Sequence, residues 1–434
     1  MRLLFLLAVV LLSRAVLLAI GIAPDPSQLE GNWQTLALAD LAANLSGEIW
    51  NQHSQPPLWN TVVGLTAKVC NAEINCVVWI LFGANILATW VSACLIVELL
   101  RALNLSTRIA VVMAVFFILS PSTVYYEFYI FYAHLSAVLM LGLVFALHRY
   151  GSADSRYALS FALVLAVSLC WLWSLFHPIF IGVVFVAAWI LNTEKTKTRR
   201  AMAMFALAFV VAIAPSVKNQ AKFGMFSNGS WVGLNMGRVV SDALPGFEPT
   251  CDFIDYRDKK RTAGVTHPGT AFNSPDMVPL SKYCVGASVT AALQNPLPII
   301  ANRLDALAHR FSLMPHDYFI PPLNWDRIPD LPFGRNGSFN NTKTSWDVKV
   351  FEWVTLGMYV FAWLAMAQIA FAHADAGTRK LFKSLLLIAL FFTALSIAFN
   401  RGEQQRMRYT IEPFFLFAVV VAISQILVRV RRRA

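Results

Sequence analysis

The feature that most constrains this chain is a series of apolar runs, several of which reach the length of a bilayer crossing. A transmembrane helix needs about 20 predominantly apolar residues, and we read about ten such spans here. They cover residues 3–22, 77–99, 109–124, 126–147, 157–174, 176–192, 201–216, 351–372, 382–399 and 410–428. The sequence therefore predicts an all-α polytopic membrane protein whose residues 1–434 form a single membrane domain.

The composition supports a membrane protein and argues against a nucleic-acid partner. Hydrophobic residues make up 57% of the chain and charged residues only 14%, whereas a soluble domain carries about 25% charged residues. The net charge is +11. Much of this basic excess lies in short loops between apolar runs, as expected for the cytoplasmic loops of membrane proteins. We therefore predict the bilayer, and no nucleic acid, as a partner.

The first apolar run, residues 3–22, has two readings. A basic residue, Arg2, followed by an apolar stretch is also typical of a cleaved signal peptide. The run is long, Arg14 lies inside it, and no clear small-x-small cleavage site follows. We interpret it as a retained first span.

Basic clusters assign the loops to two sides of the membrane, because short loops rich in lysine and arginine lie on the cytoplasmic side. With ten spans these clusters all fall on one face, as do both termini: Arg101 with Arg108, Arg149 with Arg156, and residues 195–200, 379–383 and 429–433. Three polar segments then share the outer face. They are a first outer loop with juxtamembrane helices (23–76), a long outer loop expected to act as a cap (217–350), and a turn at 400–409.

Three outer segments carry helical patterns. Apolar residues at helical spacing predict a helix over residues 30–41 that lies on the membrane, with Glu30 at its start and Asp40 near its end. Residues 57–68 predict an apolar helix too short to span, either re-entrant or interfacial. Residues 295–313 fit an amphipathic helix lying on the membrane.

Four of the six cysteines lie in or beside the outer loops. Cys70 is close to Cys76, and Cys251 shares the long loop with Cys284. In an oxidising compartment each pair can form a disulfide. Spacing alone does not establish the geometry, so free thiols remain the alternative.

The first outer loop carries the densest set of chemically useful side chains. They are Asp25, Glu30, Asp40, Glu48 and His53, and the tripeptide 55–57 follows them with Gln55 and two prolines. A carboxylate beside apolar walls can have its pKa raised and act as a general base. The alternative for each acid is a solvated charge at the membrane interface. The two prolines also serve as an ordinary helix start.

Two further outer positions carry candidate binding groups. Glu127 lies near a membrane boundary, where a carboxylate is costly unless it is paired or functional. His134, one to two turns deeper, fits a hydrogen-bonded contact between helices. Lys218 and Asn219 follow the seventh span and can hold a phosphate. The alternative for Lys218 is a lysine that snorkels to the interface.

The turn at 400–409 concentrates arginine on the outer face, against the usual charge bias. Arg401, Arg406 and Arg408 lie close to Glu403 there. Guanidinium forks suit phosphate or pyrophosphate oxygens. Glu412 follows within the tenth span and is expected to pair with one of these arginines.

Four short motifs occur in order along these outer segments. They are an acid and an aromatic residue before Gln-Pro-Pro-Leu-Trp (Glu30, Trp33, 55–59); a Ser-Pro turn and an acid (Ser120, Pro121, Glu127); Pro-x-x-x-Asn, Phe-Gly and Gly-Leu-Asn (Pro215, Asn219, 223–224, 233–235); and Glu-x-x-Arg-x-Arg-Tyr before Glu-Pro (Glu403, Arg406, Arg408, Tyr409, 412–413). Together they resemble the GT-C superfamily of polytopic glycosyltransferases, most closely its protein-mannosyltransferase and aminoarabinose-transferase-like group. The resemblance spans most of the chain.

The resemblance implies transfer of a sugar from a polyprenyl-phosphate donor to a hydroxyl of a lipid, glycan or protein acceptor. A carboxylate of the first outer loop would act as the base, with Glu30 first, Asp25 second and Asp40 third. The implied substrate-binding residues are His53, Gln55, Glu127, Lys218, Asn219, Arg401, Glu403, Arg406 and Arg408. No metal or cofactor is implied. The expected location is the bacterial inner membrane with the site on the periplasmic face, and a eukaryotic lumen remains the alternative.

Two other functions stay open at this point. A transporter or flippase for a lipid-linked substrate would use the same outer cations for binding without chemistry. A non-catalytic membrane subunit would carry a degenerate site, because Gln55 stands where the family has histidine and Glu30 where it most often has aspartate. No dinucleotide fingerprint, phosphate-binding loop, zinc-protease motif or nucleophile elbow stands in a suitable context.

Overall fold

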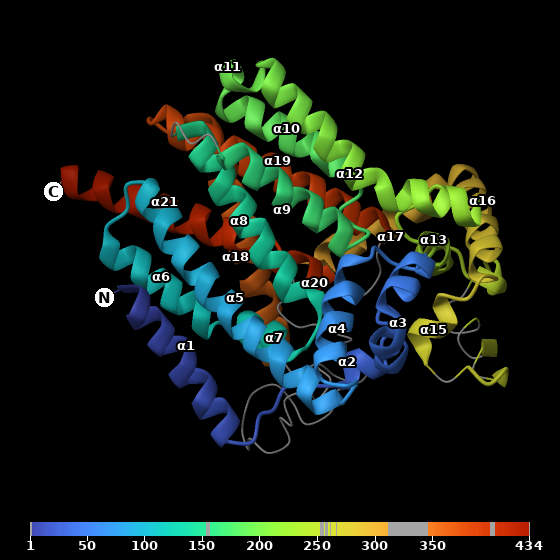
Figure 1. Ribbon diagram of the computed structural model, residues 1–434. Coiled ribbons are helices and arrows are strands. Elements are labelled where there is room, and N and C mark those ends of the chain that lie inside the picture. The colour runs from blue at the N-terminus through green and yellow to red at the C-terminus, as the bar shows by residue number, and fades with distance from the viewer. Residues whose placement is uncertain are drawn as a thin grey trace.

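The computed structural model describes residues 2–152, 157–251, 256, 259–260, 262–265, 267–310, 346–399 and 404–433. Within these ranges the regular structure is helical and no strand is present. The apolar helices are α1 (Arg2–Ala19), α5 (Ile74–Ala102), α6 (Thr107–Leu119), α7 (Pro121–Phe128), α8 (Tyr132–Ser152), α9 (Ala158–Leu172), α10 (Ile179–Leu191), α12 (Arg199–Phe223), α18 (Trp346–Ala372), α19 (Ala376–Phe399) and α21 (Glu412–Arg433) (Figure 1).

The remaining helices connect or cover the ends of these. The connecting helices are α2 (Ser27–Glu30), α3 (Leu38–Asn51), α4 (Leu58–Val69), α11 (Thr193–Thr196), α13 (Val232–Ala243), α15 (Pro268–Phe272), α16 (Met277–Gln294), α17 (Pro296–Arg310) and α20 (Gln404–Tyr409), with a 3-10 turn at Pro249–Cys251. Figure 1 shows both chain termini at one end of the molecule, away from α13, α15 and α16.

Several helices of the described chain can cross a bilayer. Five qualify alone by length and composition, namely α1, α5, α8, α12 and α19, and the total rises to seven if each of two bent pairs is one span. The bent pairs are α6 with α7 and α16 with α17. Shorter apolar helices occupy other predicted spans, including α9 and α10. The chain is thus a polytopic α-helical membrane protein.

The boundary between α6 and α7 changes the sequence interpretation of Glu127. Ser120 ends α6 and caps α7, accepting a hydrogen bond from the Thr123 amide at 3.2 Å. Pro121 follows at the first helical position, where its missing N–H costs nothing, and the two helices meet at 49°. We placed Glu127 at the start of the fourth span, and that was wrong. Glu127 lies in the last turn of α7, and α8 begins five residues later at Tyr132.

The predicted helix over residues 30–41 is also wrong. Glu30 ends the single turn of α2, and an irregular segment leads to α3, where Asp40 lies in the first turn. Polar side chains hold this segment out of a helix. Asn32 Oδ1 accepts a hydrogen bond from the Gln34 amide at 2.8 Å, a local contact that competes with helix. Asn60 Oδ1 accepts another from the Leu36 amide at 2.8 Å.

Two other local predictions are confirmed. The short apolar helix predicted for residues 57–68 is α4. The helix predicted for residues 295–313 is α17 up to Arg310, and residues 311–313 lie outside the described ranges.

Both predicted cysteine pairs are disulfides. Cys70–Cys76 joins the end of α4 to the start of α5. Cys251–Cys284 joins the 3-10 turn to α16 at the centre of a small apolar core, which we call the cap core. The buried residues of the cap core are Trp231, Leu234, Cys251, Tyr256, Phe272, Met277 and Cys284. The described part of the segment after α12, which we call the cap, therefore has an apolar core separate from that of the bundle.

We predict that Cys251→Ser loosens the cap while the helical bundle stays folded. The bridge spans a sequence separation of 33 residues, and losing such a bridge costs about 2–4 kcal/mol. Limited proteolysis should then cut between α13 and α16 at a lower protease concentration than in the wild type. Cys76→Ser, which breaks the other bridge, should leave cap cleavage unchanged. Equal cleavage of Cys251→Ser and wild type would contradict a stabilising role for this bridge.

Candidate functional site

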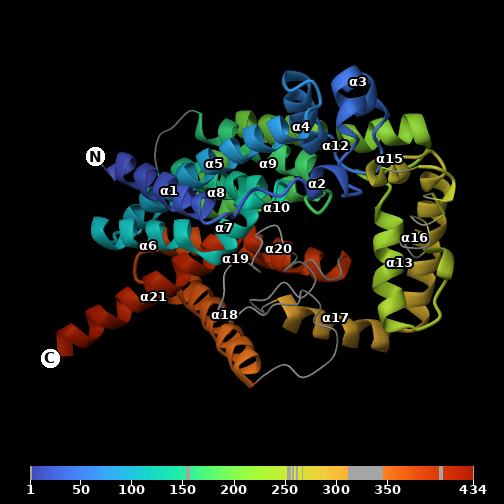
Figure 2. The ribbon, with the colours of Figure 1, turned by 90° about the horizontal axis from the view of Figure 1, so that it is seen from below.

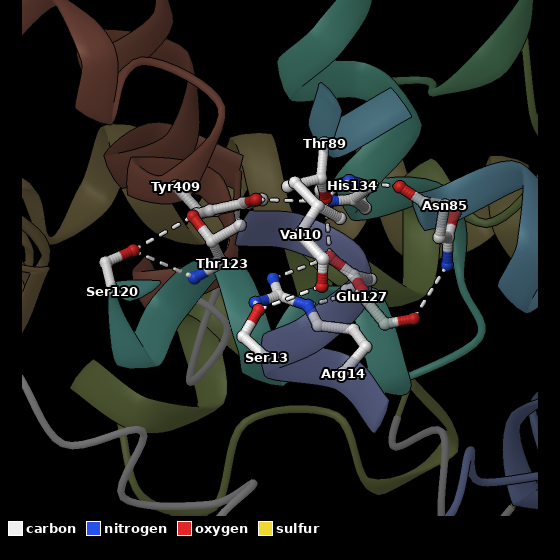
Figure 3. Close-up of polar contacts among 10 residues, drawn as sticks. All are labelled: Val10, Ser13, Arg14, Asn85, Thr89, Ser120, Thr123, Glu127, His134 and Tyr409. Atoms are coloured by element: carbon white, nitrogen blue, oxygen red, sulfur yellow. Dashed lines mark hydrogen bonds and ion pairs between the residues drawn. The ribbon is translucent and has the colours of Figure 1, made fainter. Parts of the chain in front are cut away.

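A buried ion pair joins the first apolar helix to the end of α7 (Figure 3). Arg14 Nε donates to Glu127 Oε1 and Arg14 Nη2 to Glu127 Oε2, both at 2.8 Å. The side chains are 1% and 0% exposed. This fork geometry satisfies both carboxylate oxygens at once. Because isolated charges are very costly to bury, each side chain depends on the other.

The ion pair continues into a hydrogen-bonded network that crosses three more helices. Thr89 of α5 donates to Glu127 Oε2 at 2.5 Å, and Thr89 Oγ1 lies 3.0 Å from His134 Nε2. His134 of α8 lies 2.8 Å, through Nδ1, from the Tyr409 hydroxyl of α20. The sequence interpretation of His134 as a contact between helices is confirmed. Five helices therefore meet around one carboxylate, as Figure 3 shows.

We predict that breaking this ion pair on one side destabilises the protein strongly, while removing both charges does not. Arg14→Met leaves the Glu127 carboxylate without its counter-ion, at a cost of about 3–5 kcal/mol. The double variant Arg14→Met with Glu127→Gln should recover most of that loss. The measurement is thermal unfolding of the purified protein in lipid nanodiscs.

The control is Arg101→Met, which breaks the exposed pair with Glu98, whose side chains are 43% and 52% exposed. Such surface pairs contribute about 0–1 kcal/mol. Equal losses for Arg14→Met and Arg101→Met would contradict the importance of the buried pair.

Asp25 contacts the backbone directly beside the ion pair. Its amide donates to the carbonyl of Phe128 at 3.0 Å, next to Glu127, and Asp25 forms an isolated parallel bridge with Tyr129. Its carboxylate accepts hydrogen bonds from the Ser27 amide at 3.0 Å and the Ser27 hydroxyl at 2.5 Å. The backbone of Asp25 therefore fixes the position at which the first outer loop starts. Its half-buried carboxylate is already hydrogen-bonded to Ser27.

The irregular segment after α2 is fixed to α4 and α8. The Tyr132 hydroxyl donates to Gln34 Oε1 at 2.5 Å, and Asn60 Nδ2 donates to the Gln34 carbonyl at 3.0 Å. Trp59 Nε1 donates to Thr35 Oγ1 at 3.2 Å. The segment that separates Glu30 from Asp40 is therefore held rigidly by buried side chains.

The end of α3 meets the outer end of α12. Lys218 Nζ donates to the Gln52 carbonyl, and Lys222 Nζ donates to the Asn51 side chain. Asn219, buried on the same helix, donates to the Ser227 carbonyl at 2.8 Å. Of the predicted binding residues, Lys218 thus contacts the first outer loop, and Asn219 contacts the segment that follows α12.

His53 is one of the residues through which the first outer loop contacts the cap. Its amide donates to Asn273 Oδ1 at 2.8 Å, and its carbonyl accepts from the Ser230 amide at 2.7 Å. Its ring Nδ1 lies 2.8 Å from Ser230 Oγ, and the ring packs edge-on against Phe223 at 4.7 Å between centroids. Burial lowers the pKa of His53 to about 4, against the opposing effect of its backbone contact with Asn273. His53 is therefore neutral at physiological pH.

Gln55, two residues after His53, is also buried and accepts a long hydrogen bond from Ser174 at 3.5 Å.

The acids of the first outer loop gather near a histidine that sequence reasoning missed. Burial lowers the pKa of His267, and a hydrogen bond with the backbone of Leu29 and the charges of Asp40 and Glu30 act in the opposite direction. Glu30 and Asp40 are both exposed. Burial, followed by the charge of Asp40, raises the pKa of Glu48.

A close backbone approach brings the cap to these acids. A Cβ at Gly269 would lie 1.7 Å from the Thr35 carbonyl oxygen, so glycine is required where α15 meets the first outer loop. His267 lies two residues before this contact, at the N-cap position of helix α15. The sequence signal that points to it is a histidine directly before Pro268 and Gly269 in a long outer loop.

The arginine turn is described only in part. Arg401 and Glu403 lie outside the described residues, as does the side chain of Arg406. Arg408 is 2% exposed, and its guanidinium lies 4.6 Å above the ring of Tyr359. The Tyr359 hydroxyl donates to Glu412 Oε1 at 3.0 Å. Arg408 and Glu412 therefore both contact Tyr359, and Arg408 is buried next to Tyr409, the last residue of the ion-pair network.

The site therefore belongs to a polytopic membrane protein and lies at one end of its helical bundle. Comparisons with protein-family models, with curated proteins and with solved structures find no match to this chain. Among the described residues, no group of three or more His, Cys, Asp or Glu side chains is placed to hold a metal ion.

We predict that acidification weakens the contact between the first outer loop and the cap through His53. The folded pKa is about 4 and the unfolded pKa about 6.5, so the unfolded chain binds the proton first. Stability is therefore lost as the pH falls from 6.5 towards 4, by up to about 3 kcal/mol. Thermal unfolding should show this loss in the wild type and a smaller one in His53→Gln. The same acid dependence in both proteins would contradict the assignment.

Proposed function

We propose that this chain is a GT-C-type glycosyltransferase with about ten transmembrane helices. It transfers a sugar from a polyprenyl-phosphate donor to a hydroxyl of a lipid, glycan or protein acceptor. The reaction takes place at the end of the bundle that carries Asp25, His53 and the cap. We assign this end to the outer face, which is the periplasmic face of a bacterial inner membrane.

The observation that carries the proposal is the meeting of the four motif segments at one end of the bundle. The first outer loop contacts the end of α7 through Asp25 and Phe128, and the cap through His53 and Ser230. Tyr409, from the fourth motif, reaches the acid of the second motif through His134 and Thr89. These segments are far apart in the sequence, so their contact does not follow from chain connectivity. A shared site explains why they converge.

The arrangement divides the three candidate acids into different roles. Glu30 and Asp40 are exposed, and both act on the pKa of His267. Asp25 is bound to Ser27 and to the backbone beside α7. We assign Glu30, the first choice that the resemblance implies, as the base that removes the acceptor proton, and Asp25 as a residue that positions the loop. A single direct displacement would invert the anomeric carbon.

Cations near the first outer loop suit the phosphate that leaves. Lys218 and Lys222 already reach the carbonyl and amide groups at the end of α3. In the proposed reaction the bond between the anomeric carbon and the phosphate oxygen breaks, and the negative charge develops on that phosphate. Preorganised cations stabilise such charge with little reorganisation. We assign this role to Lys218.

The test compares sugar transfer by matched variants. Purified protein in lipid nanodiscs receives a panel of radiolabelled polyprenyl-phosphate sugars and membrane extracts as acceptors. Glu30→Gln should lower the transfer rate about 100-fold or more, the effect expected for loss of a general base. Glu73→Gln is the control, because Glu73 lies in the same loop and caps α5 at residues Asn75 and Cys76.

Different results separate the parts of the proposal. Equal rates for Glu30→Gln and wild type would reject Glu30 as the base, and Asp40→Asn and Asp25→Asn would then identify the acid that replaces it. If no donor of the panel is consumed by folded wild-type protein, the enzyme class is wrong. Donor binding without consumption would favour a transporter or flippase of lipid-linked substrates.

A further inference from the structure

The bent pair α16–α17 has the composition of a membrane segment although it belongs to the cap. Together the two helices meet the length and hydropathy requirements of a span, but they are bent by 98° at residue 295. Between Met277 and Leu304 the charged residues are Lys282 and Arg303, both basic.

The pair exposes its apolar residues on the side away from the cap core. Met277, Ser281, Cys284 and Ser288 are buried on α16, and Cys284 carries the bridge to Cys251. Tyr283, Val289 and Leu293 lie elsewhere around the same helix and are exposed. After the bend, Leu297, Ile300 and Leu304 are exposed on α17. Leu293 and Leu297 are each 77% exposed, which is a high cost in water for side chains of this size.

The path of the described chain argues against a bilayer crossing by this pair. Ser384, early in α19, donates to the Ala187 carbonyl near the end of α10 at 3.1 Å. The basic clusters 195–200 and 379–383 therefore lie at the same end of the bundle. One more crossing between α12 and α18 would place them on opposite faces. The chain must therefore enter and leave the α16–α17 pair on the same face of the membrane, the outer face.

The second helix of the pair is fixed to the outer end of the bundle. Arg303 Nη1 donates to the Ile397 carbonyl at the end of α19 at 3.3 Å. Asp242 of α13 lies 3.9 Å from Arg303 Nη2. Figure 2 shows α17 between α16 on one side and α18 and α20 on the other. The exposed apolar residues of α17 that flank Arg303, namely Ile300 and Leu304, therefore lie near the end of α19.

We infer that the bend between α16 and α17 lies in the outer leaflet of the lipid bilayer as an interfacial helical pair. Leu293, Leu297 and Ile300 contact acyl chains, while the exposed Lys282 lies at the level of the lipid phosphates. Arg303 is held by the protein, at the Ile397 carbonyl and beside Asp242. A basic residue beside an apolar helical face is typical of helices in this interface. This inference does not depend on the proposed enzymatic activity.

The test measures the depth of single positions by spin labelling of the full-length protein in lipid nanodiscs. Cys94 and Cys170 are the free cysteines of the described chain, and Cys94→Ala with Cys170→Ala removes them while both disulfides stay. Labels are introduced at Leu293→Cys, Leu297→Cys and Ile300→Cys. Leu364→Cys on α18, an exposed apolar position, reports on lipid, and Ala263→Cys, an exposed cap position, reports on water.

The readout compares collision of the label with oxygen, which concentrates in lipid, and with a water-soluble nickel chelate. The three test positions should show the several-fold excess of oxygen over nickel collisions that Leu364→Cys shows. A nickel excess like that of Ala263→Cys would overturn the inference. Protection from both agents would also overturn it, because the face would then be covered by protein, as in a dimer. Each labelled variant must keep the elution profile of the unlabelled protein.

Discussion

The ion pair between Arg14 and Glu127 is the interaction on which the outer end of this molecule depends. Burial in α1 is limited to Leu6, Val10 and Arg14 among its described side chains. Apolar packing alone therefore leaves the rotation and depth of this helix weakly determined. The charged fork selects one arrangement, because any other rotation would leave a charge buried without a partner. Since the first outer loop begins directly after α1, its starting point is set by the same pair.

From this fixed point, amide and hydroxyl contacts build the rest of the site. Gln34 is held by Tyr132 and Asn60, and His53 is held by Ser230 and Asn273. These side chains are neutral, and all but the half-buried Asn273 are buried, so they position the loop without competing for a charged ligand. The exposed carboxylates of Glu30 and Asp40 lie at the two ends of this fixed segment of the loop. A general base needs this combination of a free carboxylate and a fixed backbone.

The apolar runs were sufficient to predict a helical membrane protein, and the paired cysteines were sufficient to suggest the two disulfides. The sequence did not predict the break at Gly31 and Asn32, because the periodicity of Trp33, Leu36 and Leu41 favours a continuous helix. Tertiary contacts from Asn60 overrode that local pattern. Arg14 was noticed only as an unusual charge in an apolar run. Its partner lies 113 residues away, and a pairing at that distance leaves no local signal in one sequence.

The membrane explains why the charged side chains of this site are buried and paired on one side and exposed on the other. Towards the bundle, charge is tolerated only as a closed network, so Glu127 is fully buried and bonded by Arg14 and Thr89. Towards the cap, water reaches the chain and the carboxylates of Glu30 and Asp40 remain exposed. If the α16–α17 bend rests in the outer leaflet, the cap is attached to the bundle and to the lipid at once. A lipid-linked donor would then meet these acids at the interface, where its phosphate already lies, without leaving the bilayer.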